Sequence, residues 1–278
     1  MLPRRVFRQL STVSKTIVNS HDDFSPLKHI IIGRPDESCI APNEPASNHK
    51  IPFDSDMKGM SGPRPYHTVK AAMKQMDNFE DLLKSHGIRV DRPDPKLCKW
   101  TKPTETPFWK SGTEFGCMPA RDVLLTVGNE MVEATMSFRS RWFEYRAYRD
   151  ILRRYWLEDH NMKWEAAPKP NLTDETYKEN YLTEHESADE AFRLEKMANR
   201  DFVTKDWHEP LFDAADILRI GKDLFCQQGF TTNLAGIEWI RRHFPDHRVH
   251  CLNFPGDPYP IHIDFKVSHK NFFDFFVS

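Results

Sequence analysis

The sequence holds three short groups of ionisable side chains that could exchange protons or bind a cation. In the segment His262-Ile263-Asp264 the two polar residues are two apart, and in an extended strand they would point to the same face. A histidine beside a carboxylate can act as a general acid or base, because the carboxylate orients the imidazole and makes it more basic. The alternative is an exposed strand edge, and the spacing leaves both interpretations open.

The other two groups are aspartates that precede apolar segments. Asp213 and Asp216 are separated by two alanines, whose small side chains leave room for a ligand. Two adjacent carboxylates can bind a guanidinium, or one of them can have a raised pKa and exchange protons. Asp122 stands beside Arg121 at the start of an apolar run and could also bind a cation. The structural alternatives are an Asx turn at Asp213 and, favoured by the spacing, a strand-end cap at Asp122.

Composition and motifs exclude several other classes of function. The net charge is −2, and acidic residues interrupt the arginines of residues 139–154, so we expect no nucleic-acid partner. The sequence contains no run of about 18 apolar residues, so we expect no transmembrane helix. The five cysteines are scattered and no histidine cluster accompanies them, so we expect reduced thiols and no structural zinc. Phosphate-binding glycine loops and the common hydrolase motifs are absent from the sequence.

The elements that position these groups repeat one layout. The first unit opens with an apolar strand at residues 29–32 and continues with a helix over about residues 68–85, which Gly87 ends. A strand at residues 88–90 follows. The helix is predicted from apolar residues at steps of three and four, namely Val69, Met73, Met76, Phe79 and Leu83.

Two further units add a hairpin at their start. In the second, strands at residues 122–127 and 130–134 flank Gly128-Asn129, a turn signal typical of hairpins. A helix over residues 140–157 and a strand at 163–166 complete it. In the third, strands at 216–220 and 223–226, a helix over 233–244 and a strand at 248–252 repeat the plan. Residues 171–200 are predicted to be a polar, helical insertion with a solvated face. A fourth unit would open near His262 but does not develop.

The first twenty residues differ from the rest. They carry Arg4, Arg5, Arg8 and Lys15 with no acidic residue, and they are rich in serine and threonine. This composition predicts a mitochondrial transit peptide, and a disordered basic tail is the alternative.

Several long segments resemble the glycine amidinotransferases: residues 122–130, 139–149, 167–170, 212–216 and 236–243. The resemblance extends from about residue 25 to Asp264. It implies an α/β fold, a five-bladed β/α propeller of the pentein type, of which about three units are present here. The family moves an amidino group from L-arginine to an acceptor amine through a cysteine-bound intermediate. Glycine is the acceptor in creatine biosynthesis, and neither a metal nor an organic cofactor is implied.

The resemblance also assigns roles to single residues. Asp213 and His262 match the catalytic aspartate and histidine of the family, and His262 would move protons between the thiol and the amines. Asp122 and Asp264 match carboxylates that surround the substrate guanidinium. L-arginine and a small amine, with glycine expected, would be the partners. A homodimer is expected for a complete chain, and the location would be mitochondrial, at the inner membrane or in the intermembrane space, with the cytoplasm as the alternative.

The sequence departs from the family pattern at two places. The family's nucleophilic cysteine lies in a later, glycine-rich segment, so we expect residues 21–264 to be an incomplete propeller domain and the chain to be inactive as it stands. Residues 265–278 do not resemble the family. Glycine-using members tend to have Asn-Pro-Met before the His-Ile-Asp segment, where this chain has Tyr259-Pro260-Ile261. The alternatives are therefore a non-catalytic short isoform, a transferase with another acceptor, or a hydrolase of the same superfamily.

Overall fold

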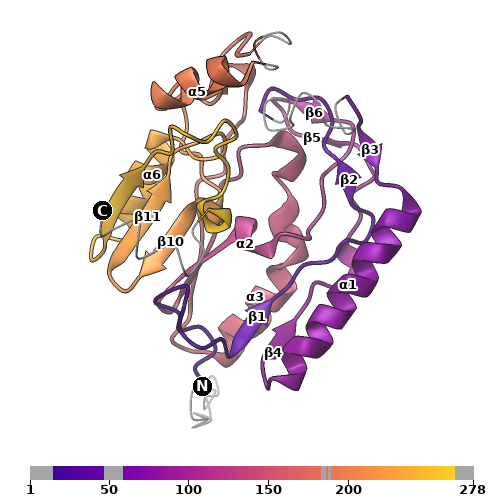
Figure 1. Cartoon of the computed structure of the whole chain (residues 1–278). Helices are drawn as coiled ribbons and strands as arrows, with labels where there is room; N and C mark the ends of the chain where they lie inside the picture. The colour runs from indigo at the N-terminus through magenta and orange to yellow at the C-terminus, as the bar shows by residue number, and fades with distance from the viewer. Residues whose placement is uncertain (1–14, 47–58, 183–185, 187–188, 267–278) are drawn as a thin grey trace, which may run out of the picture.

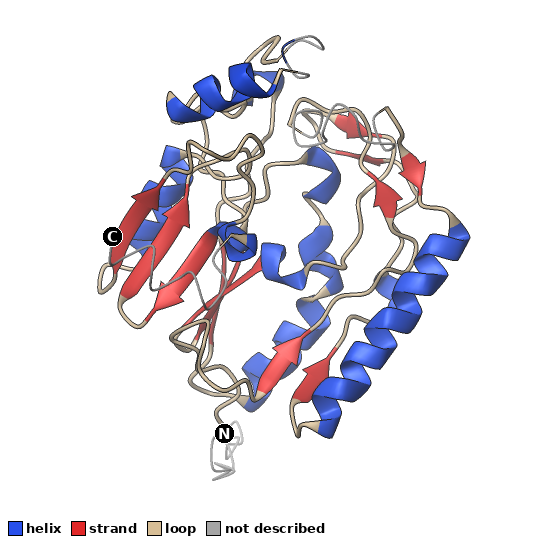
Figure 2. Cartoon of the chain, in the orientation of Figure 1, coloured by secondary structure: helices blue, strands red, loops and turns tan. Residues whose placement is uncertain are grey.

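The computed structural model describes residues 15–46, 59–182, 186 and 189–266, and it confirms the predicted repeat of strands and helices. Three units follow one another, each with a parallel strand pair and a helix that packs on its closing strand. In Figure 1 the first unit lies on the right and the third on the left, with the second between and behind them. Figure 2 shows the helices of the first and third units on the outer sides of their strands.

The first unit consists of β1 (His29–Ile31), α1 (Tyr66–Ser85) and β4 (Arg89–Asp91). β1 and β4 pair in parallel, and α1 packs on β4. Gly87 ends the helix as predicted, in the left-handed region (φ +76°) and with its N–H donating to the Lys84 carbonyl at 2.9 Å. The apolar stripe of α1 is only partly covered, since Leu83 is buried whereas Phe79 is 43% exposed.

The second unit consists of β7 (Leu124–Val127), β8 (Glu130–Glu133), α3 (Arg149–Glu158) and β9 (Lys163–Ala166). β7 and β8 form the predicted antiparallel hairpin, with Gly128 at φ +60°, and β9 runs parallel to β8. The predicted single helix over residues 140–157 is wrong in its first half. Two 3₁₀ turns, η2 (Arg139–Arg141) and η3 (Glu144–Ala147), precede α3, and both bury polar side chains that a one-sided helix would expose.

The third unit has β10 (Ile217–Ile220), β11 (Asp223–Gln227), α6 (Leu234–His243) and β12 (Arg248–Leu252). Its pairing copies the second unit, with an antiparallel β10–β11 hairpin and a parallel β11–β12 pair. The Asn233 side chain caps α6 by accepting the N–H of Gly236 at 2.9 Å.

Shorter elements connect the units. They are β2 (Cys39–Ile40), β3 (Gly62–Pro63), η1 (Pro95–Leu97), β5 (Thr104–Glu105), β6 (Lys110–Ser111), α2 (Ala120–Val123), η4 (Asp174–Thr176), α5 (Glu190–Ala198), η5 (Ala214–Asp216) and η6 (Ile263–Phe265). β2 pairs with β3 and β5 pairs with β6, both antiparallel.

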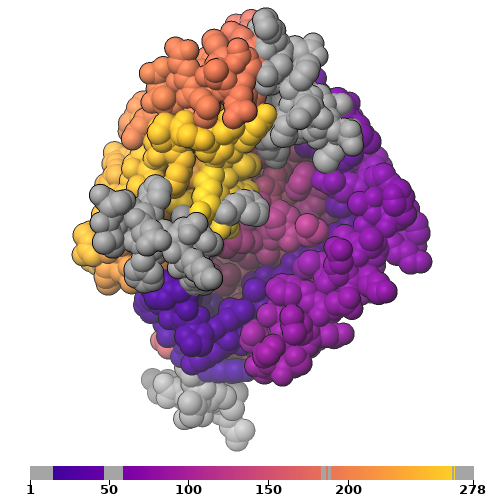
Figure 3. Space-filling view, in the orientation of Figure 1, coloured from indigo at the N-terminus to yellow at the C-terminus, as the bar shows by residue number. Residues whose placement is uncertain are grey.

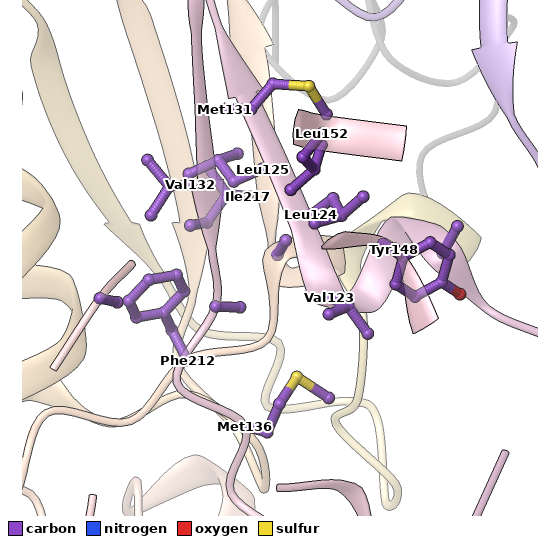
Figure 4. Close-up of a cluster of buried hydrophobic side chains, with 14 of the residues drawn as sticks. Val123, Leu124, Leu125, Met131, Val132, Met136, Tyr148, Leu152, Phe212 and Ile217 are labelled. Atoms are coloured by element: carbon purple, nitrogen blue, oxygen red, sulfur yellow. The ribbon is translucent and has the colours of Figure 1, made fainter. Parts of the chain in front are cut away.

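The main hydrophobic core joins the second and third units. Figure 4 shows Leu125, Val132 and Ile217 gathered between the strands of the two units, with Tyr148 and Leu152 against β7. Leu125, Val132 and Ile217 are fully buried, and burial of such side chains stabilises a fold by about 2 kcal/mol each. The two units therefore form one packed body.

A second core lies under the region predicted to be a polar, helical insertion with a solvated face. The helix α5 and its exposed outer face agree with this prediction, but the region also buries apolar side chains. Leu172, Tyr177 and Met197 are at most 3% exposed and belong to one cluster with Phe202 and Phe230. The polar composition hid this, because α5 has polar residues on its outer face and buries only Arg193 and Met197. Residues 183–185 and 187–188 lie outside the described part.

The folded part begins before residue 20. One carboxylate oxygen of Asp159 accepts the N–H groups of Ile17 (2.7 Å) and Val18 (3.1 Å), and the Val18 side chain is 5% exposed. Ser20 bridges to Gly128. The predicted transit peptide of residues 1–20 therefore overlaps the fold at its end, while residues 1–14 lie outside the described part, as do residues 267–278 of the predicted tail.

The surface is hollowed between the first unit and the segment that precedes η6. Figure 3 shows this hollow between purple and yellow atoms, with magenta mid-chain residues at its floor. Within the described residues, the helices are too short or too polar to cross a bilayer.

Candidate active site

The candidate site is built from three helical turns that contact one another. α2 and η5 each stand directly before the first strand of a hairpin, β7 and β10, and η6 packs on η5 and β10. Arg121 joins α2 to η5 and the start of β10, because its guanidinium donates to the carbonyls of Ala214 and Ile217. The repeat of the fold thus brings turns that are far apart in the sequence to one place.

Three of the four predicted site residues meet here. His262 Nε2 lies 3.1 Å from Asp213 Oδ2, and Nδ1 lies 3.6 Å from Asp122 Oδ1. All three residues are at most 7% exposed. The extended strand predicted at His262 is wrong, because the 3₁₀ turn η6 (Ile263–Phe265) directly follows His262. His262 adopts φ +52°, which costs energy for a residue other than glycine and is typical of functional sites.

The surroundings of His262 favour its charged form. Desolvation acts to lower the pKa of His262, but the hydrogen bond with Asp213 and the charges of Asp122 and Asp216 outweigh it and raise the pKa above its usual value. A histidine with a raised pKa binds its proton more tightly than a free imidazole and can give it to a leaving amine.

Arg141 is the residue that the sequence argument missed. Its Nη1 donates to Asp122 Oδ2 at 2.9 Å and to Asp213 Oδ2 at 3.4 Å, and its Cζ lies 5.1 Å from the centre of the Phe115 ring. In the sequence, Arg141 is one of several arginines of residues 139–154 and has no distinguishing pattern. The structure places it inside the site, where its charge holds two of the carboxylates in position.

Glu144 holds Arg141 from the other side. Arg141 Nε and Nη2 donate to the Glu144 carboxylate at 2.8–3.1 Å. Side chains three apart are nearly eclipsed in 3₁₀ geometry, so the break of the predicted helix into η2 and η3 aligns this pair. Desolvation raises the pKa of Glu144 to about 7, against the charge of Arg141, which lowers it. The spacing of three between an arginine and a glutamate was a signal in the sequence.

Asp216 positions the turn that carries His262. Its Oδ1 accepts the N–H of His262 at 2.8 Å, and its Oδ2 accepts the hydroxyls of Thr231 and Thr232 at 2.6 Å each. Desolvation raises the pKa of Asp216 to about 6, with the charge of His262 opposing. The family resemblance assigned a catalytic role to Asp213 and none to Asp216. Asp216 could have been found from its position, because Asp122 and Asp216 both lie just before the first strand of a hairpin.

Asp264 lies beside this cluster. It is half-buried in η6, and desolvation raises its pKa, whereas the charges of Arg121 and His262 lower it. Its Oδ1 is buried and without a hydrogen-bond partner in the described part of the chain, and so is Asp213 Oδ1. Two buried carboxylate oxygens with free lone pairs are acceptors for a ligand that carries N–H groups.

The segment before Asp213 is fixed by close packing. Phe212 exchanges two hydrogen bonds with Thr135 Oγ1, and Asn233 Oδ1 accepts the N–H of Leu211 at 3.0 Å. A Cβ on Gly236 would lie 2.0 Å from the Leu211 carbonyl oxygen, so only glycine allows α6 to approach this segment. The position of Asp213 therefore depends on the third unit as a whole.

The donor atoms of Asp122, Asp213 and His262 lie within 4.8 Å of one another, a spacing that could suit a metal ion. Arg141 Nη1 already donates to both carboxylates, however, and a divalent cation at this place would be repelled by the guanidinium. The donor set therefore fits a guanidinium better than a metal.

The five cysteines have other surroundings. Cys39 Sγ faces the Trp100 carbonyl, and Cys98 Sγ lies 3.4 Å from Cys117 Sγ. Cys226 is buried in β11, where desolvation raises its pKa, and Cys251 is in β12. The pKa values of Cys39, Cys117, Cys226 and Cys251 are raised, which makes these thiols poor nucleophiles, whereas the Cys98 thiol is in contact with Cys117.

Comparisons with known proteins agree with the resemblance found in the sequence. Glycine amidinotransferase, mitochondrial, of Gallus gallus is 40% identical over 253 residues, which are 89% of this chain and 57% of that protein. L-arginine:L-lysine amidinotransferase of Pseudomonas savastanoi pv. phaseolicola is 36% identical over 253 residues, with shares of 89% and 65%. The chain thus spans little more than half the length of the first of these relatives. No family model matches it.

Solved structures support the predicted fold class. SxtG, an amidinotransferase from Microseira wollei in the saxitoxin biosynthetic pathway, superimposes with a TM-score of 0.72 at 33% identity, over 89% of this chain and 65% of that one. Inosamine-phosphate amidinotransferase StrB1 from Streptomyces griseus gives a TM-score of 0.70 at 26% identity, over 85% and 63%. The partial β/α propeller predicted from the sequence is confirmed.

Proposed function

We propose that this chain, which is related in sequence and fold to the amidinotransferases, carries the guanidinium-binding and proton-transfer half of an arginine amidinotransferase site. The observation that carries the proposal is the pair of free, buried oxygens, Asp213 Oδ1 and Asp264 Oδ1, next to a histidine that favours its protonated form. The two carboxylate oxygens need hydrogen-bond donors and a positive charge as partners. A guanidinium supplies both, because it is positively charged and carries planar N–H donors.

L-arginine would place its guanidinium among Asp122, Asp213 and Asp264. In the transfer reaction, a cysteine thiolate forms a bond to the guanidinium carbon, and the bond from that carbon to the ornithine nitrogen breaks. His262 would give its proton to the leaving ornithine amine and take one from the acceptor amine. The acceptor nitrogen then bonds to the same carbon, and the thiolate leaves.

We assign no cysteine of this chain to the nucleophilic step, because each of the five thiols has the separate surroundings described above. Arginine binding without transfer is therefore the expected property of the chain on its own. Glycine is the first candidate acceptor, in agreement with the names of the vertebrate relatives, and a longer amine such as lysine is the second.

The residue at position 259 favours a longer amine such as lysine as a second possible acceptor. Position 259 differs from the pattern of glycine-using members, and the Tyr259 ring lies 4.1 Å from the guanidinium carbon of Arg193 in α5. The insertion that holds α5 therefore contacts the segment that leads to His262. Acceptor choice would follow from this contact.

Arginine binding to the purified chain, measured by calorimetry, tests the proposal. We expect binding of L-arginine but not of citrulline, which has the same shape and no charge. Asp264→Asn and Asp213→Asn should each weaken arginine binding by about tenfold or more. Asp223→Asn, which changes a carboxylate paired with Arg248 on the surface, should leave binding unchanged. Equal binding of citrulline and arginine would overturn the proposal.

Product formation separates the alternatives. Incubation with L-arginine and glycine, or with L-arginine and L-lysine, should release no ornithine from this chain alone. Ornithine would show that one of the five cysteines is the nucleophile, and citrulline would indicate a hydrolase. Mitochondrial location, which the names of the vertebrate relatives favour, is tested by import of the chain with and without residues 1–14.

A further inference from the structure

Two buried thiols face each other outside the candidate site. Cys98 Sγ and Cys117 Sγ are 3.4 Å apart, close to the van der Waals contact of two sulfurs, and both residues are fully buried. A disulfide needs sulfurs about 2.05 Å apart, with Cβ atoms close enough to permit it. The two sulfur atoms must therefore move closer together before a disulfide can form between them.

The two thiols differ in their surroundings. The hydrogen bond from the Cys117 thiol lowers the pKa of Cys98, against desolvation, which raises it. The same contact and burial raise the pKa of Cys117. Cys98 is thus the better nucleophile of the pair, and the Cys117 sulfur is close enough to attack an oxidised Cys98.

Cys98 is buried directly beside a turn that lies on the surface. It directly follows the short turn η1 (Pro95–Leu97), and Leu97 is 40% exposed. Lys99, the next residue, points its ammonium group to the surface, where it pairs with Glu37. A short, exposed turn of this kind opens more easily than a core strand, and opening exposes the Cys98 thiol to a small oxidant.

We propose that Cys98 and Cys117 form a redox-active dithiol that hydrogen peroxide oxidises to a disulfide. The Cys98 thiolate attacks one peroxide oxygen, the O–O bond breaks, and the products are Cys98 sulfenic acid and water. The Cys117 sulfur then attacks the Cys98 sulfur, and the S–O bond breaks to release a second water. The two thiols lose two electrons and two protons, which the peroxide takes up. Thiols such as glutathione reverse the reaction by exchange.

The bond would connect the turn at η1 to the segment that leads into the candidate site. The Cys117 carbonyl accepts the Tyr148 hydroxyl at 2.6 Å and the Arg34 N–H at 3.2 Å, so its backbone is firmly held. Asp122 follows five residues later in α2. We expect the turn at η1, which lies on the surface, to move towards Cys117.

Peptide mapping of the purified full chain tests the proposal. After treatment with hydrogen peroxide, alkylation of the remaining thiols and tryptic digestion without reductant, we expect the peptide of residues 97–99 linked to that of residues 111–121. The number of free thiols under denaturing conditions should fall from five to three, and dithiothreitol should restore it. The linked peptide identifies the pair directly in the unaltered chain.

Variants provide the controls. Cys39→Ser changes another buried cysteine and should leave the linked peptide in place, whereas Cys98→Ala and Cys117→Ala should each abolish it. Sulfinic acid on Cys98 without a linked peptide, or a bond between Cys226 and Cys251 in its place, would overturn the proposal. The mapping does not depend on arginine binding, so its result stands apart from that of the proposed function.

Discussion

Arg141 Nη1 donates to Asp122 Oδ2 at 2.9 Å, and the two side chains are at most 9% exposed. The chain therefore places a guanidinium of its own against the carboxylates that are proposed to receive a substrate guanidinium. Glu144 balances the charge of Arg141, which leaves the charges of Asp122 and Asp213 available. A second cation can enter because the acids still outnumber the bases.

Arg141→Met should strongly destabilise the fold. The variant keeps the side-chain volume but leaves Asp122, Asp213 and Glu144 buried without their cation, and loss of one partner from a buried ion pair costs about 3–5 kcal/mol. Urea unfolding monitored by fluorescence measures this change. Arg248→Met, at the exposed pair with Asp223, is the matched control and should leave the midpoint unchanged. Equal midpoints for both variants would show that Arg141 has no such role.

Asp213→Asn should lower the pKa of His262. The carboxylate of Asp213 is 3.1 Å from His262 Nε2 and contributes both a hydrogen bond and a negative charge to the imidazolium. An NMR titration of the histidine ring protons, with His262→Gln for assignment, gives the value. The amide cannot supply the charge, so the titration should move to lower pH.

The control for this titration is Asp223→Asn. Asp223 lies 2.7 Å from His250 Nε2 in the third unit, so its removal alters another histidine and should leave the His262 curve in place. An unchanged His262 pKa in Asp213→Asn would show that Asp213 does not contribute to the proton affinity of His262.

Lys169 should make stability rise with pH in mildly alkaline solution. Desolvation lowers its pKa to about 8, with Glu133 opposing, and its Nζ donates to the Ala134 carbonyl at 2.9 Å. Between about 8 and the unfolded value near 10.4, the unfolded chain binds a proton that the folded chain has lost, so stability increases with pH. The gain relative to Lys169→Met should reach up to about 3 kcal/mol.

The measurement is a series of urea unfolding curves from pH 7 to pH 10.5 for the wild type and Lys169→Met. Lys163→Met, an exposed lysine in β9, is the control and should follow the wild-type curve. A constant difference between the wild type and Lys169→Met across this range would contradict the prediction.

Gly236→Ala should destabilise the third unit and loosen Asp213. The new Cβ would meet the Leu211 carbonyl oxygen at 2.0 Å, so α6 or the segment before Asp213 must move, at a cost of about 2 kcal/mol or more. Gly256→Ala adds a Cβ with no heavy atom within 4 Å and should be near neutral in the same thermal unfolding assay. Arginine affinity of the folded Gly236→Ala variant reports the effect on Asp213.

Local patterns predicted the strands well. The bounds of β9 and β12 match the prediction. A short apolar or alternating run that follows a polar turn is typical of a strand and is too short for a helix. The helix over residues 140–157 failed because its polar residues Arg141 and Glu144 find partners inside the protein, and periodicity assumes that polar residues face water. The burial of Leu172 and Met197 was not predicted for the same reason, because the segment that covers them has polar residues on its outer face.

The site was predictable in its residues more than in its geometry. Asp122, Asp213 and His262 do meet, whereas the extended strand expected for His262 is a turn with a positive φ, which no local pattern signals. Arg141 could not be placed from the sequence, because its role depends on contacts with three separate turns. The role of Asp216 depends likewise on a hydrogen bond to the backbone 46 residues later.

The N-terminal segment has a consequence for how the chain folds during synthesis. Ile17 and Val18 are held by Asp159, 142 and 141 residues later, and the Asp23 carboxylate accepts the N–H of Arg219, 196 residues later. A nascent chain has none of these partners until most of it has left the ribosome, so its leading residues stay unattached throughout that time. Closing such long loops is slow, and the attachment of this segment is expected to be among the last steps of folding. An unattached leading segment remains open to any receptor that recognises it first.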